Sequence, residues 1–182
     1  MNLVPDKFFL TRGVGVHKDE LHSFELALRD AGIAHGNIVQ VSSILPPHCE
    51  QVTRDEGATL LLPGAITFVV MSRLSSDEPR RQLSASIGCA KPVSTDRFGY
   101  LSEFHGFGLD EDEAGDRAED LAAAMLASTL GLEFDVDQAW DEKKEIWKIS
   151  SQIVRTSNVT QSAVASAGGV WTTVLAAAVL LP

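Results

Sequence analysis

The chain has 182 residues, 45% of them hydrophobic, and this size fits one domain with one core. The net charge of −10 argues against nucleic acid as a partner, because phosphates require a basic surface. It also argues against adsorption to anionic lipid. Two cysteines without a CxxC pair are too few for a disulfide scaffold. The N-terminal residues lack the features of a signal peptide, so we expect a cytoplasmic protein.

The first part of the chain alternates strand and helix patterns. Residues 7–16 (KFFLTRGVGV) predict a strand, and residues 18–32 (KDELHSFELALRDAG) predict a helix that ends at a glycine. The apolar residues at helical spacing, expected to be buried, are Leu21, Phe24, Leu28 and Ala31. Residues 37–45 (NIVQVSSIL) then predict a strand, which must end before two prolines that cannot donate to a sheet.

The rest of the chain adds strands around one more helix. The segments expected to be strands are 58–76, broken at a Pro-Gly pair, then 81–91, 99–108 and 145–157. Residues 110–132 predict a helix, because an acidic start suits the positive end of the helix dipole and a glycine suits its end. A single α+β domain over residues 1–182, with helices packed on sheet faces, follows from this order.

The tail from residue 159 to residue 182 carries no charged residue. Its length is compatible with a membrane helix, but its serines, threonines, glycine pair and β-branched residues favour a buried strand. We therefore expect a strand here, at a subunit contact if the protein forms oligomers, and no membrane span.

Several common motifs are missing. The glycines near residue 13 and residue 106 do not make a dinucleotide fingerprint, and phosphate-loop, HExxH and GxSxG patterns are absent. His48, Cys49 and Glu50 are three potential metal ligands in a row. Neighbours on an extended chain point to opposite faces, so we expect no metal site there.

Ser42 and Ser43 stand between an apolar run and two prolines. By residue type alone, this pair reads as an ordinary turn or strand end. A second chemistry is open to it: a serine hydroxyl can attack the preceding carbonyl and convert the amide into an ester. Elimination and hydrolysis then cut the backbone and leave a pyruvoyl ketone, which can react with an amine and accept electrons.

The residues around this pair resemble the pyruvoyl-dependent arginine decarboxylase family. The similar segments, in the order in which that family has them, are FELALRDAGI, NIVQVSSILPP, QLSASIGCA and SEFHG. The resemblance implies a four-layer αββα sandwich. It also implies self-cleavage into a β chain of residues 1–42 and an α chain of residues 43–182, with a pyruvoyl cofactor made from Ser43.

The resemblance assigns roles to individual residues. Asn37 matches an asparagine used in processing, and an amide donor near the scissile carbonyl suits that role. Glu103 matches the proton donor, which must stay protonated and therefore needs burial; we expect Tyr100, Leu101, Phe104 and Phe107 to surround it.

The substrate contacts follow in the same way. Glu25 stands where the family has an aspartate that pairs with the substrate guanidinium; it keeps the charge but adds a methylene. The carboxylate of Ser42, released by cleavage, would help to hold this group. Ala34 and Gly36 match positions that line the substrate tail.

The function implied by the resemblance is decarboxylation of L-arginine to agmatine and CO₂. The family also implies a homo-oligomer, a trimer or a pair of trimers, with active sites between subunits. Two alternatives remain: a pyruvoyl enzyme for another amino acid, because of Glu25, and an assembly subunit that never cleaves itself.

Overall fold

The structure is a computed structural model that describes residues 3–131 and 153–182. Its strands, in chain order, are β1 (Lys7–His17), β2 (Asn37–Gln40), β3 (Ile44–Leu45), β4 (Glu50–Gln51), β5 (Ile66–Ser76), β6 (Gln82–Pro92), β7 (Gly99–Phe107), β8 (Ile153–Val164) and β9 (Trp171–Leu181). Its helices are α1 (Glu20–Asp30), α2 (Arg54–Leu60) and α3 (Glu111–Thr129).

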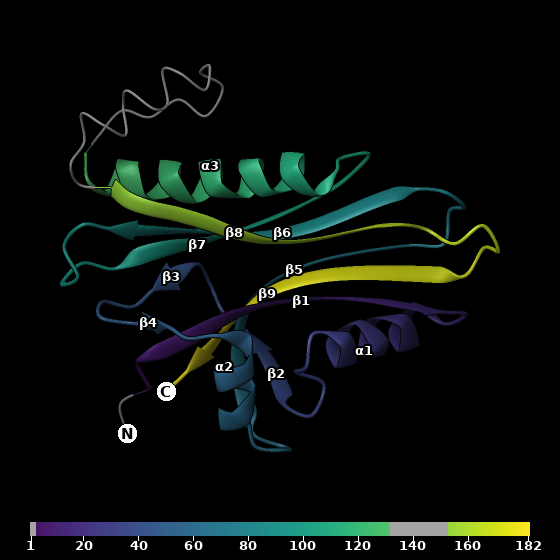
Figure 1. The fold of residues 1–182 in the computed structure, drawn as a ribbon, viewed down its shortest axis with the longest axis horizontal. Coiled ribbons are helices and arrows are strands. Elements are labelled where there is room, and N and C mark those ends of the chain that lie inside the picture. Colours follow the sequence, from purple (N-terminus) through teal and green to yellow (C-terminus); the bar gives the residue numbers. More distant parts are fainter. Residues whose placement is uncertain (1–2, 132–152) are drawn as a thin grey trace.

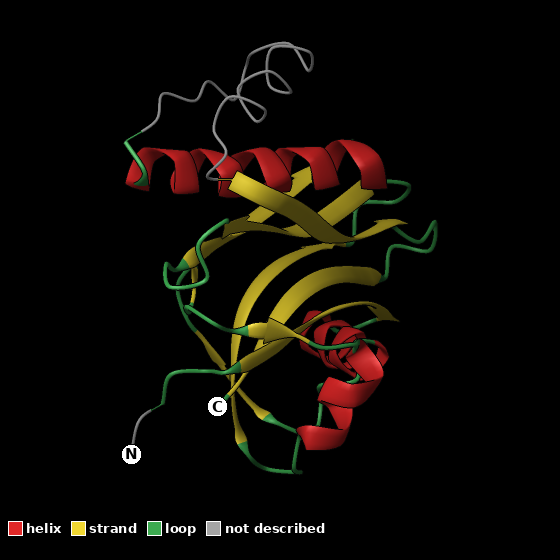
Figure 2. Cartoon of the chain, turned by 60° about the vertical axis from the view of Figure 1, so that its left-hand side comes forward, coloured by secondary structure: helices red, strands yellow, loops and turns green. Residues whose placement is uncertain are grey.

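The strands form two sheets that pack face to face. One sheet has the order β2-β5-β9-β1-β4, and the other has the order β3-β7-β6-β8. Helix α3 covers the outer face of the four-stranded sheet, while α1 and α2 lie on the outer side of the five-stranded sheet (Figure 1). Figure 2 shows the same layers after rotation. The predicted four-layer αββα sandwich is therefore confirmed.

Two apolar cores hold these layers together. Because successive side chains of a strand point to opposite faces, β1 sends Phe8 into the space between the sheets and Phe9 toward the helices. Phe8 packs with Val70 and Ala178, and Phe9 shares its core with Ala27 of α1. Phe8 thus links the two sheets, and Phe9 links the five-stranded sheet to α1.

Helix α1 lies unusually close to β1 because two glycines face it. A Cβ atom on Gly13 would lie 2.2 Å from the carbonyl oxygen of Ala27, and one on Gly15 would lie 2.1 Å from that of Ser23. This approach buries Ser23 and Ala27 on the inner side of the helix. The prediction that Leu21 is buried was wrong, since it is 79% exposed.

Two predicted strands differ from the structure. Residues 37–45 are not one strand: β2 belongs to the five-stranded sheet and β3 to the four-stranded sheet, so residues 41–43 cross between them. The apolar start of segment 58–76 lies in helix α2. Thr53 and Glu56 form a capping box there, in which each side chain accepts a hydrogen bond from the other's backbone N–H.

The helix predicted over residues 110–132 is confirmed as α3, and Asp110 and Glu113 cap its start. The tail is confirmed as buried strand: β9 lies between β5 and β1, and all of its residues after Trp171 are buried. None of the described helices is both long and apolar enough to cross a membrane. Of the strand expected over residues 145–157, the first eight residues lie outside the described part.

Candidate active site

Ser42 and Ser43 lie where the chain passes from one sheet to the other. The last bond to the five-stranded sheet runs from the N–H of Val41 to the carbonyl oxygen of Val69, at 2.8 Å. The first bond to the other sheet runs from the N–H of Leu101 to the carbonyl oxygen of Ser43, at 2.7 Å. The serine pair is therefore held from both sides.

The crossing contains a tight turn centred on Ser43. The N–H of Ile44 donates a hydrogen bond to the carbonyl oxygen of Ser42 at 3.0 Å, which closes a three-residue turn. This oxygen belongs to the peptide bond that joins the two serines. A donor already points at the group that would become negative if the Ser43 hydroxyl attacked it.

Glu103 lies close to this turn through the pairing of β3 with β7. Ile44 pairs with Tyr100, so Ser43 lies opposite Leu101, in agreement with the hydrogen bond between them. Glu103 follows Leu101 by two residues and points to the same face of β7. Diagonal positions on such a pair lie about 7–8 Å apart, a short reach for a carboxyl side chain.

The surroundings of Glu103 differ from the prediction. Tyr100 bonds through its hydroxyl to Thr129 of α3, and the ring of Phe104 lies 5.9 Å from the guanidinium carbon of Arg117, also on α3. These two rings therefore face the helix, since alternate residues of a strand point to opposite faces. Phe107 stacks under another arginine and does not line the Glu103 pocket.

Glu103 instead lines an open pocket of about 400 Å³, beside the part of β5 that extends beyond the end of β2. The pocket residues from the neighbouring elements are Phe24, Ile38, Gln40, Met71, Ser72, Arg73 and His105. The amide nitrogen of Gln40 lies 3.4 Å from each carboxylate oxygen of Glu103. Gln40 could not be predicted from local sequence, because its partners lie 31 and 63 residues further along the chain.

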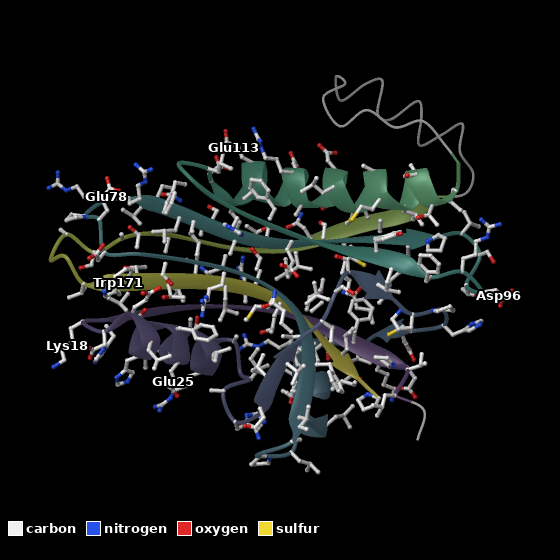
Figure 3. All side chains as sticks on the ribbon, turned by 180° about the vertical axis from the view of Figure 1, so that it is seen from behind. Lys18, Glu25, Glu78, Asp96, Glu113 and Trp171 are labelled. Carbon is white, nitrogen blue, oxygen red and sulfur yellow. The ribbon has the colours of Figure 1, made fainter. Side chains whose placement is uncertain are left out.

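Glu25 lies elsewhere, on the outer surface of α1 (Figure 3). Its Oε1 atom pairs with the Nε atom of Arg29, one turn further along the helix, at 2.6 Å. Its Oε2 atom is buried and has no hydrogen-bond partner among the described residues. An unpaired buried carboxylate oxygen is costly. Because the Glu25 side chain as a whole is 39% exposed, a small rotation can turn this oxygen toward a donor from outside the chain.

Ala34, Gly36 and Asn37 lie in the loop after α1 and at the start of β2. The side-chain amide of Asn37 donates to the carbonyl oxygen of Gly64 at 2.8 Å. Ser42 lies five residue steps after Asn37, a span of about 16 Å in extended chain, so the amide does not reach the scissile carbonyl of its own chain.

The predicted residues thus form two sets. Ser42 and Ser43 lie at the crossing, with Glu103 diagonal to Ser43 in the same chain, and we call these three residues the cleavage group, after the role that the resemblance implies for the serines. Glu25, Ala34, Gly36 and Asn37 lie apart from them on the α1 side, and we call them the outer group.

The two cysteines lie away from this pocket, in the core between the sheets. Burial raises the pKa of each thiol to about 11, and the nearby Lys91 only partly offsets this effect. Both thiols are therefore protonated near neutral pH, so neither cysteine is suited to act as a nucleophile.

A serine pair in a turn between two sheets, with a carboxyl group beside it, fits the class of decarboxylases that carry a pyruvoyl group made from their own chain. The family model described as "Pyruvoyl-dependent arginine decarboxylase (PvlArgDC)" matches residues 7–182. The chain therefore belongs to this family.

Curated relatives agree over the full length. A "Pyruvoyl-dependent arginine decarboxylase" of Nitrosopumilus maritimus is 55% identical, covering 100% of this chain and 99% of its own. A "Probable pyruvoyl-dependent arginine decarboxylase" of Chlorobium phaeovibrioides is 56% identical over 100% of both chains. "Pyruvoyl-dependent arginine decarboxylase 2" of Methanosarcina acetivorans is 52% identical over 98% of both.

The family works with a covalent pyruvoyl group, and the residues at the crossing fit it. The N–H of Leu101 donates to the carbonyl oxygen of residue 43. Formation of a pyruvoyl group changes the side chain and the nitrogen of this residue but not its carbonyl, so this hydrogen bond would remain. Ser43 is only half-buried, and Glu103, diagonal to it across the β3–β7 pair, lines the open pocket, so a ketone at residue 43 would be open to a substrate from that side.

Proposed function

We propose that the chain cuts itself between Ser42 and Ser43 and then decarboxylates L-arginine to agmatine and CO₂. The observation that carries this proposal is the turn at Ser43. It combines the attacking hydroxyl, a backbone donor on the carbonyl under attack and, in the next position on the same face, the carboxyl group of Glu103.

Cleavage begins when the hydroxyl oxygen of Ser43 bonds to the carbonyl carbon of Ser42. The N–H of Ile44 stabilises the negative charge that develops on the carbonyl oxygen, and the bond from that carbon to the nitrogen of Ser43 then breaks. The amide has become an ester. The tight turn supports this step because it keeps hydroxyl and carbonyl close together.

Elimination from the ester completes the cut. The Cα proton of residue 43 is lost, the carboxylate of Ser42 leaves, and residue 43 becomes dehydroalanine. Hydrolysis of this residue releases ammonia and leaves the pyruvoyl group. The products are the β chain of residues 1–42 and the α chain of residues 43–182.

When present, the pyruvoyl group supplies a ketone that bonds to the substrate amine and accepts electrons as CO₂ leaves. Glu103 has the task of delivering a proton to the substrate α-carbon. Its place on β7, diagonal to residue 43, supports this role. Phe24, Ile38 and Met71 supply an apolar wall to the same pocket.

Glu25 is the proposed contact for the substrate guanidinium. A guanidinium presents parallel N–H donors that match the two oxygens of a carboxylate, and the Oε2 atom of Glu25 has no partner among the described residues. Since Glu25 lies on the outer surface, it would serve the pocket of a second chain. Asn37 would likewise assist processing in a neighbouring subunit.

Exposed apolar side chains support association of copies. Val39 and Ile66 are 39% and 66% exposed, and Leu62 in the preceding turn is 69% exposed. The first two lie on the same face as Phe68, which packs into the core between the sheets. This core thus continues to the surface, where another copy can cover it. We propose a trimer or a pair of trimers.

Denaturing mass spectrometry of the purified protein tests the cleavage. Two fragments are expected, with the larger resistant to Edman sequencing because its N-terminus carries a ketone. One intact chain after prolonged incubation would instead favour the non-catalytic assembly subunit.

The substrate requires its own assay. Agmatine formation from arginine is measured with lysine, ornithine and histidine as competitors. The relatives' names and the charge on Glu25 favour arginine. Faster turnover of one competitor would favour the alternative of a pyruvoyl enzyme for another amino acid.

A further inference from the structure

The crossing between the sheets leaves the carbonyl of Met71 on β5 without a partner strand on the side where β2 ends. β2 and β5 are parallel, with Gln40 paired to Val69, and the N–H of Val41 bonds to the oxygen of Val69. Continuing this ladder by two residues would bring the N–H of Ser43 to the oxygen of Met71. The chain turns away at that point.

The side chain of Gln40 takes the place of the missing strand. Its Nε2 atom donates to the oxygen of Met71 at 3.0 Å. Because an amide nitrogen carries two hydrogens, the second N–H remains available, and it faces both carboxylate oxygens of Glu103 at 3.4 Å. The backbone oxygen of Met71 can only accept, which fixes the nitrogen rather than the oxygen of the amide on this side.

The bond to Met71 holds the amide of Gln40 in place, so its second N–H has a fixed position beside the carboxyl group of Glu103. The 3.4 Å contacts are long, so they orient the carboxyl group more than they bind it. The other charged or titratable groups in the pocket, Arg73 and His105, have no hydrogen bond to Glu103 among the described residues. Arg73 instead stacks on the ring of Phe24, at 4.3 Å.

We propose that Gln40 is a positioning residue that aims the carboxyl group of Glu103 at the substrate α-carbon. This inference rests on the proposed function of Glu103 as proton donor. A displacement of about 1 Å in such a donor can cost on the order of 100-fold in rate, so a modest orienting contact has a large effect on turnover.

Gln40→Met keeps the length of the side chain and removes both donors, so it is the informative variant. We expect normal self-cleavage, kcat lower by on the order of 10–100-fold and KM little changed. The matched control is Gln161→Met, because Gln161 also donates from its side chain to a backbone oxygen but lies on β8. The control should keep both constants.

A second readout follows from where the proton goes. If delivery to the α-carbon is slow, a proton from water reaches the carbon of the pyruvoyl group instead. Hydrolysis then releases the substrate chain as 4-guanidinobutanal and leaves the substrate nitrogen on residue 43, which becomes alanine. The α chain of Gln40→Met should therefore become accessible to Edman sequencing during turnover, faster than that of the wild type or of Gln161→Met.

A third readout needs no cofactor. In Ser43→Ala, a ¹³C-carboxyl glutamate label, assigned with Glu103→Gln, reports directly on Glu103. Adding Gln40→Met should shift this resonance, whereas adding Gln161→Met should not. An unshifted resonance with wild-type kcat in Gln40→Met would overturn the inference.

Further variants distinguish a failure of the inference about Gln40 from a failure of the role proposed for Glu103. If Gln40→Met does not fold, as judged by circular dichroism, Gln40→Glu repeats the test, because an ionised carboxylate cannot donate either. Its retention of wild-type kcat would also overturn the inference. If Glu103→Gln is fully active, the proposed function of Glu103 fails; if Glu103→Gln is impaired and Gln40→Met is not, only the inference fails.

Discussion

The cleavage group and the outer group differ in how the chain holds them. The cleavage group lies where β2, β3, β5 and β7 meet, and backbone bonds of 2.7–3.0 Å fix the crossing. The outer group lies on a helix surface and a loop, and Glu25 there pairs with Arg29 of its own helix. Sheet hydrogen bonds thus hold the cleavage group in place, whereas the outer group lies on the surface of the protein.

This difference separates bond making from binding. Attack on a carbonyl and transfer of a proton need atoms fixed to within a fraction of an ångström, which one chain supplies best through its own sheets. Recognition of a guanidinium depends on a charge and two lone pairs, which a neighbouring chain can supply. If Glu25 has the proposed role, we therefore expect the outer group to tolerate a glutamate in place of the family's aspartate.

Ser43→Ala should have the largest effect. Without the hydroxyl there is no nucleophile, so no ester, no cleavage and no decarboxylation are expected. Denaturing mass spectrometry should find one chain. Ser42→Ala is the matched control, because Ser42 contributes its carbonyl rather than its side chain, and it should still yield two fragments. Cleavage of Ser43→Ala would show that the Ser43 hydroxyl is not the nucleophile, and the role proposed for the cleavage group would fail.

Glu103→Gln should cleave normally, because Glu103 takes no part in the attack. Its kcat should fall by on the order of 10²–10⁴-fold, the usual contribution of a general acid. Steady-state kinetics with arginine, alongside mass spectrometry to confirm processing, measure both. Near-normal kcat would refute Glu103 as the proton donor and would leave self-cleavage as the only function of the cleavage group.

Glu25→Gln should act on binding. Losing a charge-assisted contact worth about 1.5–3 kcal/mol should raise KM by roughly 10–100-fold, with a small change in kcat. Glu20→Gln, in the first turn of the same helix, is the control and should leave KM unchanged. A lower kcat with an unchanged KM would place Glu25 in the chemistry instead.

Mixed oligomers sharpen this test. Ser43→Ala chains lack the pyruvoyl group but keep Glu25, and Glu25→Gln chains have the reverse defect. If the two groups meet between subunits, co-expressing both variants should restore activity at low arginine, where neither works alone. No gain over the separate variants would mean that each chain uses its own outer group.

The smallest expected effect concerns the core, away from both groups. Burial raises the pKa of Cys49 and Cys89 from an ordinary value of 9.0 to about 11. Between these values the unfolded chain loses thiol protons that the folded chain keeps, so stability present below pH 9 should decline toward pH 11. Urea unfolding at pH 8 and 10.5 should show this decline, reduced in Cys49→Ala/Cys89→Ala.

The sequence predicted the long elements well because their patterns are strong. The alternation in β6, the apolar runs that precede glycines in β1 and the acidic start of α3 all lie within short windows. Helix α2 was missed because its apolar end resembles a strand. The usable signal was the capping box, Thr53 followed three residues later by Glu56.

The parts that could not be predicted depend on long-range contacts. Leu21 is exposed because Gly13 and Gly15 draw the opposite side of α1 onto β1. The break at Ser42 depends on pairing with β7, which lies some sixty residues away. For the same reason the apolar wall beside Glu103 comes from other elements rather than from its neighbours in sequence.

The position of β1 has a thermodynamic consequence. β1 lies inside its sheet, paired with β9 along its whole length and with β4 on the other side, yet the proposed cleavage would assign it to the β chain of residues 1–42. Once the backbone is cut, unfolding releases two molecules instead of one. The melting temperature of the mature protein should therefore rise with protein concentration, as mass action requires, even within a single protomer.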